Sequence, residues 1–204
     1  MPAPFRIILI QCVAIEAVLS LAALAGYPGL RDTAFLFGGF FPLLLDGWQG
    51  VYPGQSVGMF VTYGFLHGGP LHLGMNMIAL VQLTREMRGL MTVGRMLLIY
   101  AVAQVAAGLA QTALSPGEGV MVGASGAIFG LAAALIAHGL VVLRRRRRPA
   151  GPLIRSALLI AGLNVALPVL IPQIAWQAHL GGTVAGAVLG LGLALLSPGR
   201  PRYR

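Results

Sequence analysis

The sequence contains little charge. Only 9% of its 204 residues are charged, none of them is a lysine, and aspartate and glutamate together number 5. A water-soluble domain of this length could not cover its surface with so few charged groups, which excludes that class of protein. The chain also has a single cysteine, Cys12, so it can form no intrachain disulfide.

Hydrophobic residues are abundant instead: they make up 57% of the chain, and the mean hydropathy is +0.85. This composition indicates an integral membrane protein. One span needs roughly 20 residues to cross about 30 Å of hydrocarbon, so the chain has room for about six spans. We expect residues 1–204 to form a single integral membrane domain with no separate soluble part.

Six apolar segments fit this expectation. The predicted spans are residues 7–25, 67–84 (or 71–84), 97–114, 125–143, 153–171 and 176–196. All six should be helices, because open sheet edges do not occur in lipid and the alternation of a transmembrane barrel is missing. The first segment lacks a convincing small-residue cleavage site, so we expect it to be retained rather than removed as a signal peptide.

Arginine placement predicts the orientation of the spans. If the N-terminus faces the cytoplasm, 13 of the 14 arginines lie in inner loops and tails, and Arg31 alone lies outside. This distribution obeys the positive-inside rule with one exception. We therefore expect both termini in the cytoplasm. Abundant arginine without lysine indicates a GC-rich bacterial genome, so the expected location is a bacterial inner membrane.

The arginine run at residues 144–148 could suggest nucleic-acid binding, but it lies between two apolar spans with no interleaved aromatic residues. A topology anchor that contacts anionic inner-leaflet lipid explains the run instead. Membrane lipid is therefore an expected partner, and nucleic acid is not.

The connection between the first two predicted spans, residues 26–66, is long and unusually apolar, with aromatic residues from Phe35 to Phe60 among glycines and prolines. An ordinary solvated linker does not have this composition. We expect this interfacial loop to pack on, or dip into, the outer membrane interface. It could equally serve as a lid.

Polar residues occur at the outer ends of three predicted spans. His67, His72 and Asn76 belong to the second, Ser125 opens the fourth, and His179 lies near the start of the sixth. Asn76 follows His72 by four residues and so shares its helix face. Polar side chains in membrane spans are expensive to desolvate, so their convergence at one depth would indicate an active site.

The residue types predict acyl-transfer chemistry. A serine hydroxyl becomes a nucleophile when a neutral histidine removes its proton, which assigns Ser125 and His179 as catalytic residues. Backbone N–H groups at the start of the Ser125 helix, with the side chains of His72 and Asn76, could form an oxyanion hole. A catalytic dyad is expected, because the carboxylates considered as a third member lie in outer loops or at the inner end of the second span. These are Asp32, Asp46, Glu118 and Glu86.

Glycine spacing would let the helices approach each other. The fourth span carries Gly126 and Gly130, and the sixth carries Gly182 and Gly186, each a small-xxx-small pair beside the polar residue of its span. Close packing at these glycines would bring Ser125 within hydrogen-bond reach of His179.

Each residue also has an alternative role. Ser125 could cap its helix, His72 and His179 could be interfacial histidines bonded to backbone, Asn76 could join two helices, and His67 could be structural.

Two other functions stay open. One is a metal site or transporter built on His67, His72 and His179, and the other is a catalytically silent protein that binds membrane helices. Against the metal site, no carboxylate or cysteine joins the histidines and H-E-x-x-H is absent, so we expect no metal and no cofactor.

Three motifs together resemble the rhomboid family of intramembrane serine proteases: Gly123-Ala124-Ser125-Gly126, the series His67, His72, Asn76, and Ala178-His179 followed by Gly182 and Gly186. The resemblance extends over residues 58–190. It implies Ser125 as nucleophile, His179 as general base, and His72, Asn76 and the Ser125 backbone as the oxyanion hole. It further places His67 near the site and Phe129 against the catalytic imidazole, and gives Glu86 a structural role.

The resemblance also implies a six-helix fold whose fourth span is short and leaves a water-filled cavity above Ser125. The implied substrates are single-pass membrane proteins cut within or beside their transmembrane helix. One departure concerns the interfacial loop, where many rhomboids carry a Trp-Arg pair and this chain has Gly58 and Met59.

Overall fold

The computed structural model describes residues 1–117, 119–170 and 175–196, except for the side chains of residues 163–165 and 167–170. Glu118 and the last residue of the predicted fifth span, Ile171, lie outside the described part, as do three of the arginines predicted to face the cytoplasm, Arg200, Arg202 and Arg204. The described elements are helical: α1 (Ala3–Leu24), α2 (Gly29–Gly38), η1 (Pro42–Leu45), α3 (Gln55–Thr62), η2 (Tyr63–Phe65), α4 (Pro70–Met87), α5 (Val93–Leu114), α6 (Ser125–Arg145), α7 (Gly151–Leu170) and α8 (Trp176–Leu196).

The fold is the all-α membrane bundle that the sequence predicts. Helices α1, α5, α6 and α8 are long and apolar enough to cross a membrane. Helices α4 and α7 occupy the second and fifth predicted positions. Large apolar side chains cover the outside of α1, where Ile7, Leu21 and Leu24 are all more than half exposed. In water such a surface would be unfavourable, so it is a surface for lipid.

The structure decides where the second span begins and corrects the expectation for the fourth. Helix α4 begins at Pro70, close to the later of the two predicted starts, so the start at His67 is wrong and His67 precedes the helix. Gly69 has a φ of +129°, which an α-helix cannot contain, and proline favours the first helical turn. Helix α6 has 21 residues, as many as α8, so the expectation of a short fourth span is also wrong. Its last turn contains Arg144 and Arg145, whose charges favour the carbonyl end of a helix.

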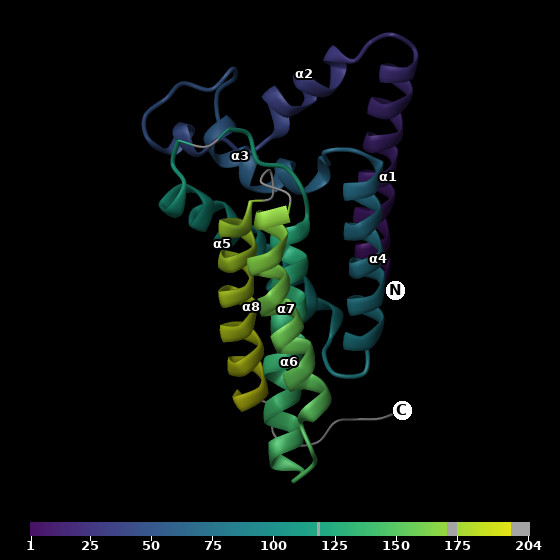
Figure 1. Cartoon of the computed structure of the whole chain (residues 1–204), viewed down its shortest axis with the longest axis vertical. Helices are drawn as coiled ribbons and strands as arrows, with labels where there is room; N and C mark the ends of the chain where they lie inside the picture. Colours follow the sequence, from purple (N-terminus) through teal and green to yellow (C-terminus); the bar gives the residue numbers. More distant parts are fainter. Residues whose placement is uncertain (118, 171–174, 197–204) are drawn as a thin grey trace.

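The interfacial loop, residues 26–66, is itself largely helical. It contains α2, η1, α3 and η2, which lie across the end of the bundle where α4, α6 and α8 begin (Figure 1). Two backbone hydrogen bonds join Phe40 to Met121, and Gly123 N–H donates to the Tyr63 carbonyl at 2.9 Å. The loop therefore fixes the segment that leads into Ser125.

Helices α6 and α8 pack with their backbones in contact. A methyl group at Gly182 would overlap the carbonyl oxygen of Gly126, and one at Gly186 would overlap that of Gly130. Helix α5 completes this packing, because Ala107 fills the space beside Gly126. Both glycine pairs thus form the close helix contact that their spacing indicates.

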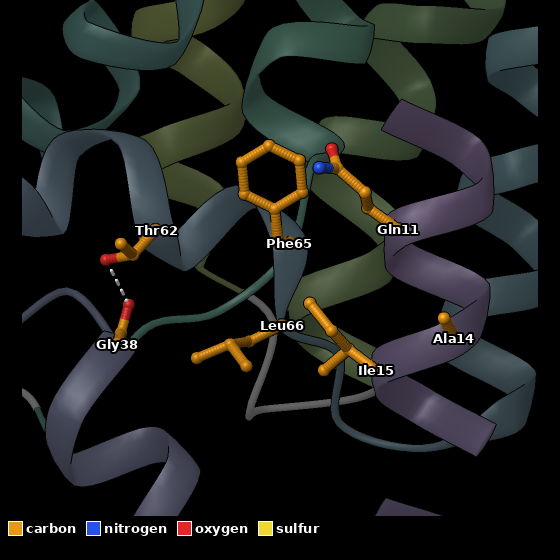
Figure 2. A pocket seen from close by; sticks show the side chains of 7 residues that line it. All are labelled: Gln11, Ala14, Ile15, Gly38, Thr62, Phe65 and Leu66. Carbon is orange, nitrogen blue, oxygen red and sulfur yellow. Dashed lines mark hydrogen bonds between the residues drawn. The ribbon is translucent and has the colours of Figure 1, made fainter. Parts of the chain in front are cut away.

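A cavity of about 410 Å³ separates α1 from the interfacial loop. Figure 2 shows Gln11 and Ile15 of α1 on one side and Phe65 and Leu66 on the other, next to the hydrogen bond from Thr62 to Gly38. The lining is almost wholly apolar, and neither Ser125 nor His179 belongs to it. This cavity is not the site predicted from the sequence.

Candidate active site

Ser125 and His179 lie in direct contact. The Ser125 side-chain oxygen is 2.8 Å from His179 Nε2, although 54 residues separate the two in the chain. Ser125 is the first residue of α6, and Ala124 holds the N-cap position without a side-chain cap. The Ser125 hydroxyl thus contacts the imidazole of His179, and Ser125 does not occupy the N-cap position of α6.

The His179 ring is buried and stacked. Only 5% of the residue is exposed, and the Phe129 ring lies parallel to it with centroids 4.3 Å apart. Phe129 follows Ser125 by one helical turn, so α6 supplies both the hydroxyl and the ring that holds the imidazole. Nδ1 of His179 has no hydrogen-bond partner within the described residues. Among the described residues, no carboxylate therefore joins Ser125 and His179 as a third member of the site.

His72 reaches the same place from α4. A methyl group on Gly123 would lie 2.9 Å from Cε1 and 3.0 Å from Nε2 of His72. Gly123 also has a φ of +122°, so both its backbone conformation and the closeness of His72 require glycine. The amide of Gly68 donates to His72 Nδ1 at 3.2 Å. A neutral His72 ring therefore carries its hydrogen on Nε2, the nitrogen that faces Gly123.

Asn76 is buried one turn further along α4. Its Nδ2 donates to the carbonyl of His72 at 2.9 Å, a contact within α4 and not between helices. A second amide hydrogen is left for another acceptor. Among the described residues, this bond gives no support to the alternative role of Asn76 as a bridge between helices.

His67 is fully buried in the turn before α4. Its ring meets the His72 ring edge to face, with centroids 5.2 Å apart. Both ring nitrogens of His67 are without a hydrogen-bond partner in the described part of the chain. The carbonyl of His67, by contrast, accepts a hydrogen bond from Arg31 at 2.8 Å.

Glu16 was not among the residues predicted from the sequence. It is the one acidic residue besides the four considered above, and it lies inside α1. It is only 2% exposed and forms an ion pair with Arg31 at 2.7 Å. The hydrogen bond to Glu16 raises the pKa of the Arg31 guanidinium. Two features of the sequence mark the residues as unusual, although not as partners: Glu16 is a carboxylate inside an apolar span, and Arg31 is the one arginine that breaks the positive-inside rule.

Glu86 lies apart from these residues. It is exposed near the inner end of α4 and accepts a hydrogen bond from Gln82 of the same helix at 2.5 Å. Its structural role stays a prediction.

The arrangement combines the parts that acyl transfer needs. A hydroxyl touches an imidazole that can take its proton. The first amides of α6, at Ser125 and Gly126, lack acceptors within the helix and can donate to an oxyanion. The amide of Gly123 cannot, because it donates to Tyr63. Within the described residues, no group of three or more histidine, cysteine or acidic side chains is arranged to hold a metal ion.

A bundle with four helices long and apolar enough to span a bilayer belongs to the class of multi-pass membrane proteins. A family model described as "Rhomboid domain" matches residues 53–195. The chain belongs to the rhomboid family.

Individual relatives agree with this assignment. RHOMBOID-like protein 5 of Arabidopsis thaliana is 35% identical over 143 residues, which are 68% of this chain and 43% of that protein. The mitochondrial RHOMBOID-like protein 6 of the same plant is 30% identical over 151 residues, 74% of this chain and 48% of that protein. Rhomboid protease GluP of Bacillus subtilis (strain 168) is 32% identical over 130 residues, 63% and 25% of the two chains. The chain spans less than half the length of these relatives.

Proposed function

We propose that this protein is an intramembrane serine endopeptidase that cleaves transmembrane-helix substrates with a Ser125–His179 dyad. The observation that carries the proposal is the 2.8 Å contact between the Ser125 oxygen and His179 Nε2 at the start of two membrane helices. Membership of the rhomboid family supports the same conclusion, as does the similarity to a protein named a rhomboid protease.

The proposed reaction has two steps. In the first, His179 Nε2 takes the proton of Ser125 while the hydroxyl oxygen attacks the substrate carbonyl carbon, and the resulting imidazolium protonates the leaving amine. In the second, His179 removes a proton from the water molecule that attacks the acyl-enzyme ester, and it gives this proton to the Ser125 oxygen as the ester bond breaks and the new carboxyl group leaves. The tetrahedral oxyanion of each step accepts hydrogen bonds from the Ser125 amide and from the side chains of His72 and Asn76.

Burial of His179 supports its role as a base. An imidazole held among apolar groups is disfavoured as a cation, so it is neutral and able to accept a proton before the reaction. The parallel ring of Phe129 restricts its rotation and keeps Nε2 directed at the hydroxyl.

The proposed substrates are single-pass membrane proteins. Helices α4, α6 and α8 begin at the same end of the bundle, so their shared site lies near one face of the membrane. A substrate helix that unwinds there would expose a peptide bond to Ser125. We further propose a bacterial inner membrane as the location, with the arginine-rich ends of the helices in the cytoplasm.

Labelling with a fluorophosphonate probe tests this function. The purified protein in detergent should form a covalent adduct, and Ser125→Ala and His179→Ala should both abolish it. Ser156→Ala is a matched control, because Ser156 is an exposed serine of α7 whose hydroxyl donates to the Pro152 carbonyl of its own helix. This variant should label like the wild type.

Each other outcome identifies a competing function. A wild-type protein that folds but takes up no probe would indicate a silent helix-binding relative. Peptidase activity that survives Ser125→Ala and disappears with a chelator would indicate a metal site. Either result would overturn the proposed dyad.

A further inference from the structure

An ion pair is buried between α1 and the interfacial loop. Arg31 of α2 donates to both carboxylate oxygens of Glu16, at 2.7 and 2.9 Å, and Ser20 donates to the same carboxylate at 2.8 Å. The Glu16 side chain is 3% exposed and that of Arg31 22%. Charges inside a membrane protein are costly and usually have a function, so this pair requires an explanation beyond the joining of two helices.

The same guanidinium also holds a backbone carbonyl. The nitrogen Nη1 of Arg31 that donates to Glu16 also donates to the carbonyl oxygen of His67, at 2.8 Å. This carbonyl and the amide of Gly68 form one planar peptide group, with its oxygen and its hydrogen on opposite sides. Fixing the oxygen therefore fixes the direction of the Gly68 N–H.

The Gly68 amide in turn orients His72. It donates to His72 Nδ1 at 3.2 Å, which leaves the hydrogen of the neutral ring on Nε2. That nitrogen faces Gly123, two residues before Ser125. A continuous set of hydrogen bonds thus runs from Glu16 through Arg31 and one peptide group to the edge of the Ser125 site.

We propose that Glu16 and Arg31 are positioning residues: through the His67–Gly68 peptide group they hold His72 in the ring orientation and tautomer that donate Nε2–H to the oxyanion. The inference rests on the proposed protease function and deepens it. Apolar side chains could join α1 to α2 equally well, but they could not donate to the His67 carbonyl. The charge pair supplies that donor.

The test separates positioning from stability. In the double variant Glu16→Leu/Arg31→Met both charges are removed, a change that buried ion pairs often tolerate when the volume is kept. We expect its thermal unfolding temperature in detergent to stay close to that of the wild type. The rate constant for fluorophosphonate labelling, normalised to folded protein, should fall about tenfold, the factor that corresponds to the loss of one hydrogen bond. Thr33→Ala, an exposed substitution on α2, should change neither quantity.

The decisive comparison uses His72→Ala as a background. His72→Ala alone should slow labelling about 100-fold, the effect of one lost oxyanion donor. Adding Glu16→Leu/Arg31→Met to it should have no further effect, because the pair acts through His72. If the tenfold loss persists in this background, or if the double variant labels like the wild type, the positioning role is refuted. If the double variant does not fold, Arg31→Lys takes its place, since lysine keeps the charge but loses the planar fork.

A spectroscopic measurement is independent of catalysis. Nitrogen-15 NMR of labelled histidine reports which ring nitrogen carries the hydrogen. The wild type should show His72 with hydrogen on Nε2, assigned by its loss in His72→Ala, and Glu16→Leu/Arg31→Met should show a mixture of tautomers. An unchanged His72 signal would overturn the inference even if the protein labels. A wild type that shows the Nε2 tautomer but never labels would instead refute the proposed protease function alone.

Discussion

Gly182 of α8 lies so close to the carbonyl oxygen of Gly126 in α6 that no side chain fits between them. Gly126 directly follows Ser125, and Gly182 comes one helical turn after His179. The contact of the two backbones therefore determines how near the hydroxyl and the imidazole can come. Any increase in the helix separation at this point lengthens the 2.8 Å contact.

Gly182→Ala should consequently impair the site. The added methyl group forces α6 and α8 apart or distorts them, at a cost of about 1–3 kcal/mol typical of overpacking. We expect a lower unfolding temperature and slower fluorophosphonate labelling per folded molecule. Gly192→Ala is the matched control on the same helix, because a methyl group there meets nothing within 4 Å. Equal labelling by both variants would show that the backbone contact does not control the site.

Gly123→Ala tests the approach of His72 to Ser125. The substitution places a methyl group against the His72 ring and requires alanine to adopt a φ of +122°. Such backbone strain costs on the order of 1–3 kcal/mol. We expect a large decrease in the rate constant for fluorophosphonate labelling and only a modest decrease in the unfolding temperature, because His72 must move away from the oxyanion.

Gly119→Ala provides the comparison in the same connection. Its added methyl group has open space, and Gly119 is not among the glycines with positive φ. It should label at the wild-type rate. A Gly123→Ala protein with unimpaired labelling would argue against His72 as an oxyanion donor.

Long apolar segments, the spacing of glycines and the chemistry of a few polar residues were enough to predict the helical bundle and the packing of α6 against α8. Long apolar segments identify membrane helices, and glycines spaced by three residues mark close helix contacts. Both are local properties of the chain, so the sequence alone reveals them. The contact between Ser125 and His179 follows from them once the spans are placed.

The interfacial loop could not be predicted in this way. Its short helices are fixed by contacts with distant residues, such as Phe40 with Met121 and Tyr63 with Gly123, and no periodic pattern records such pairings. The Glu16–Arg31 pair was missed for a related reason: each residue is unusual in its own segment, but only the fold of the loop brings them together.

Phe129 should matter through its flat ring. Phe129→Leu keeps an apolar side chain but removes the parallel stacking on His179. A stacked pair contributes about 0.5–1.5 kcal/mol, so labelling should slow about two- to tenfold with little change in unfolding temperature. Phe129→Tyr keeps the ring and should label faster than Phe129→Leu. The reverse order would exclude stacking as the contribution of Phe129.

The orientation of the helices can be tested with single cysteines. In a Cys12→Ala background, Trp48→Cys, Arg88→Cys and Arg148→Cys place exposed thiols in the interfacial loop and in two arginine-rich connections. On intact bacterial cells a membrane-impermeant maleimide should label position 48 and spare positions 88 and 148. Lysed cells should label at all three, and the Cys12→Ala parent should not react. Labelling of position 88 or 148 on intact cells would reverse the proposed topology.

The substrate helix should be cleaved faster where it is easier to unwind. A peptide bond in a stable helix is shielded, and each glycine weakens a helix by about 1 kcal/mol relative to alanine. Two central glycines weaken a designed single-pass helix by about 2 kcal/mol, so it should be cut roughly 30-fold faster than the same helix with two leucines, whose propensity is close to that of alanine. Gel analysis in proteoliposomes measures both rates, and the Ser125→Ala protein provides the background. Equal rates for the two helices would mean that unwinding does not limit cleavage and that the site accepts an intact helix.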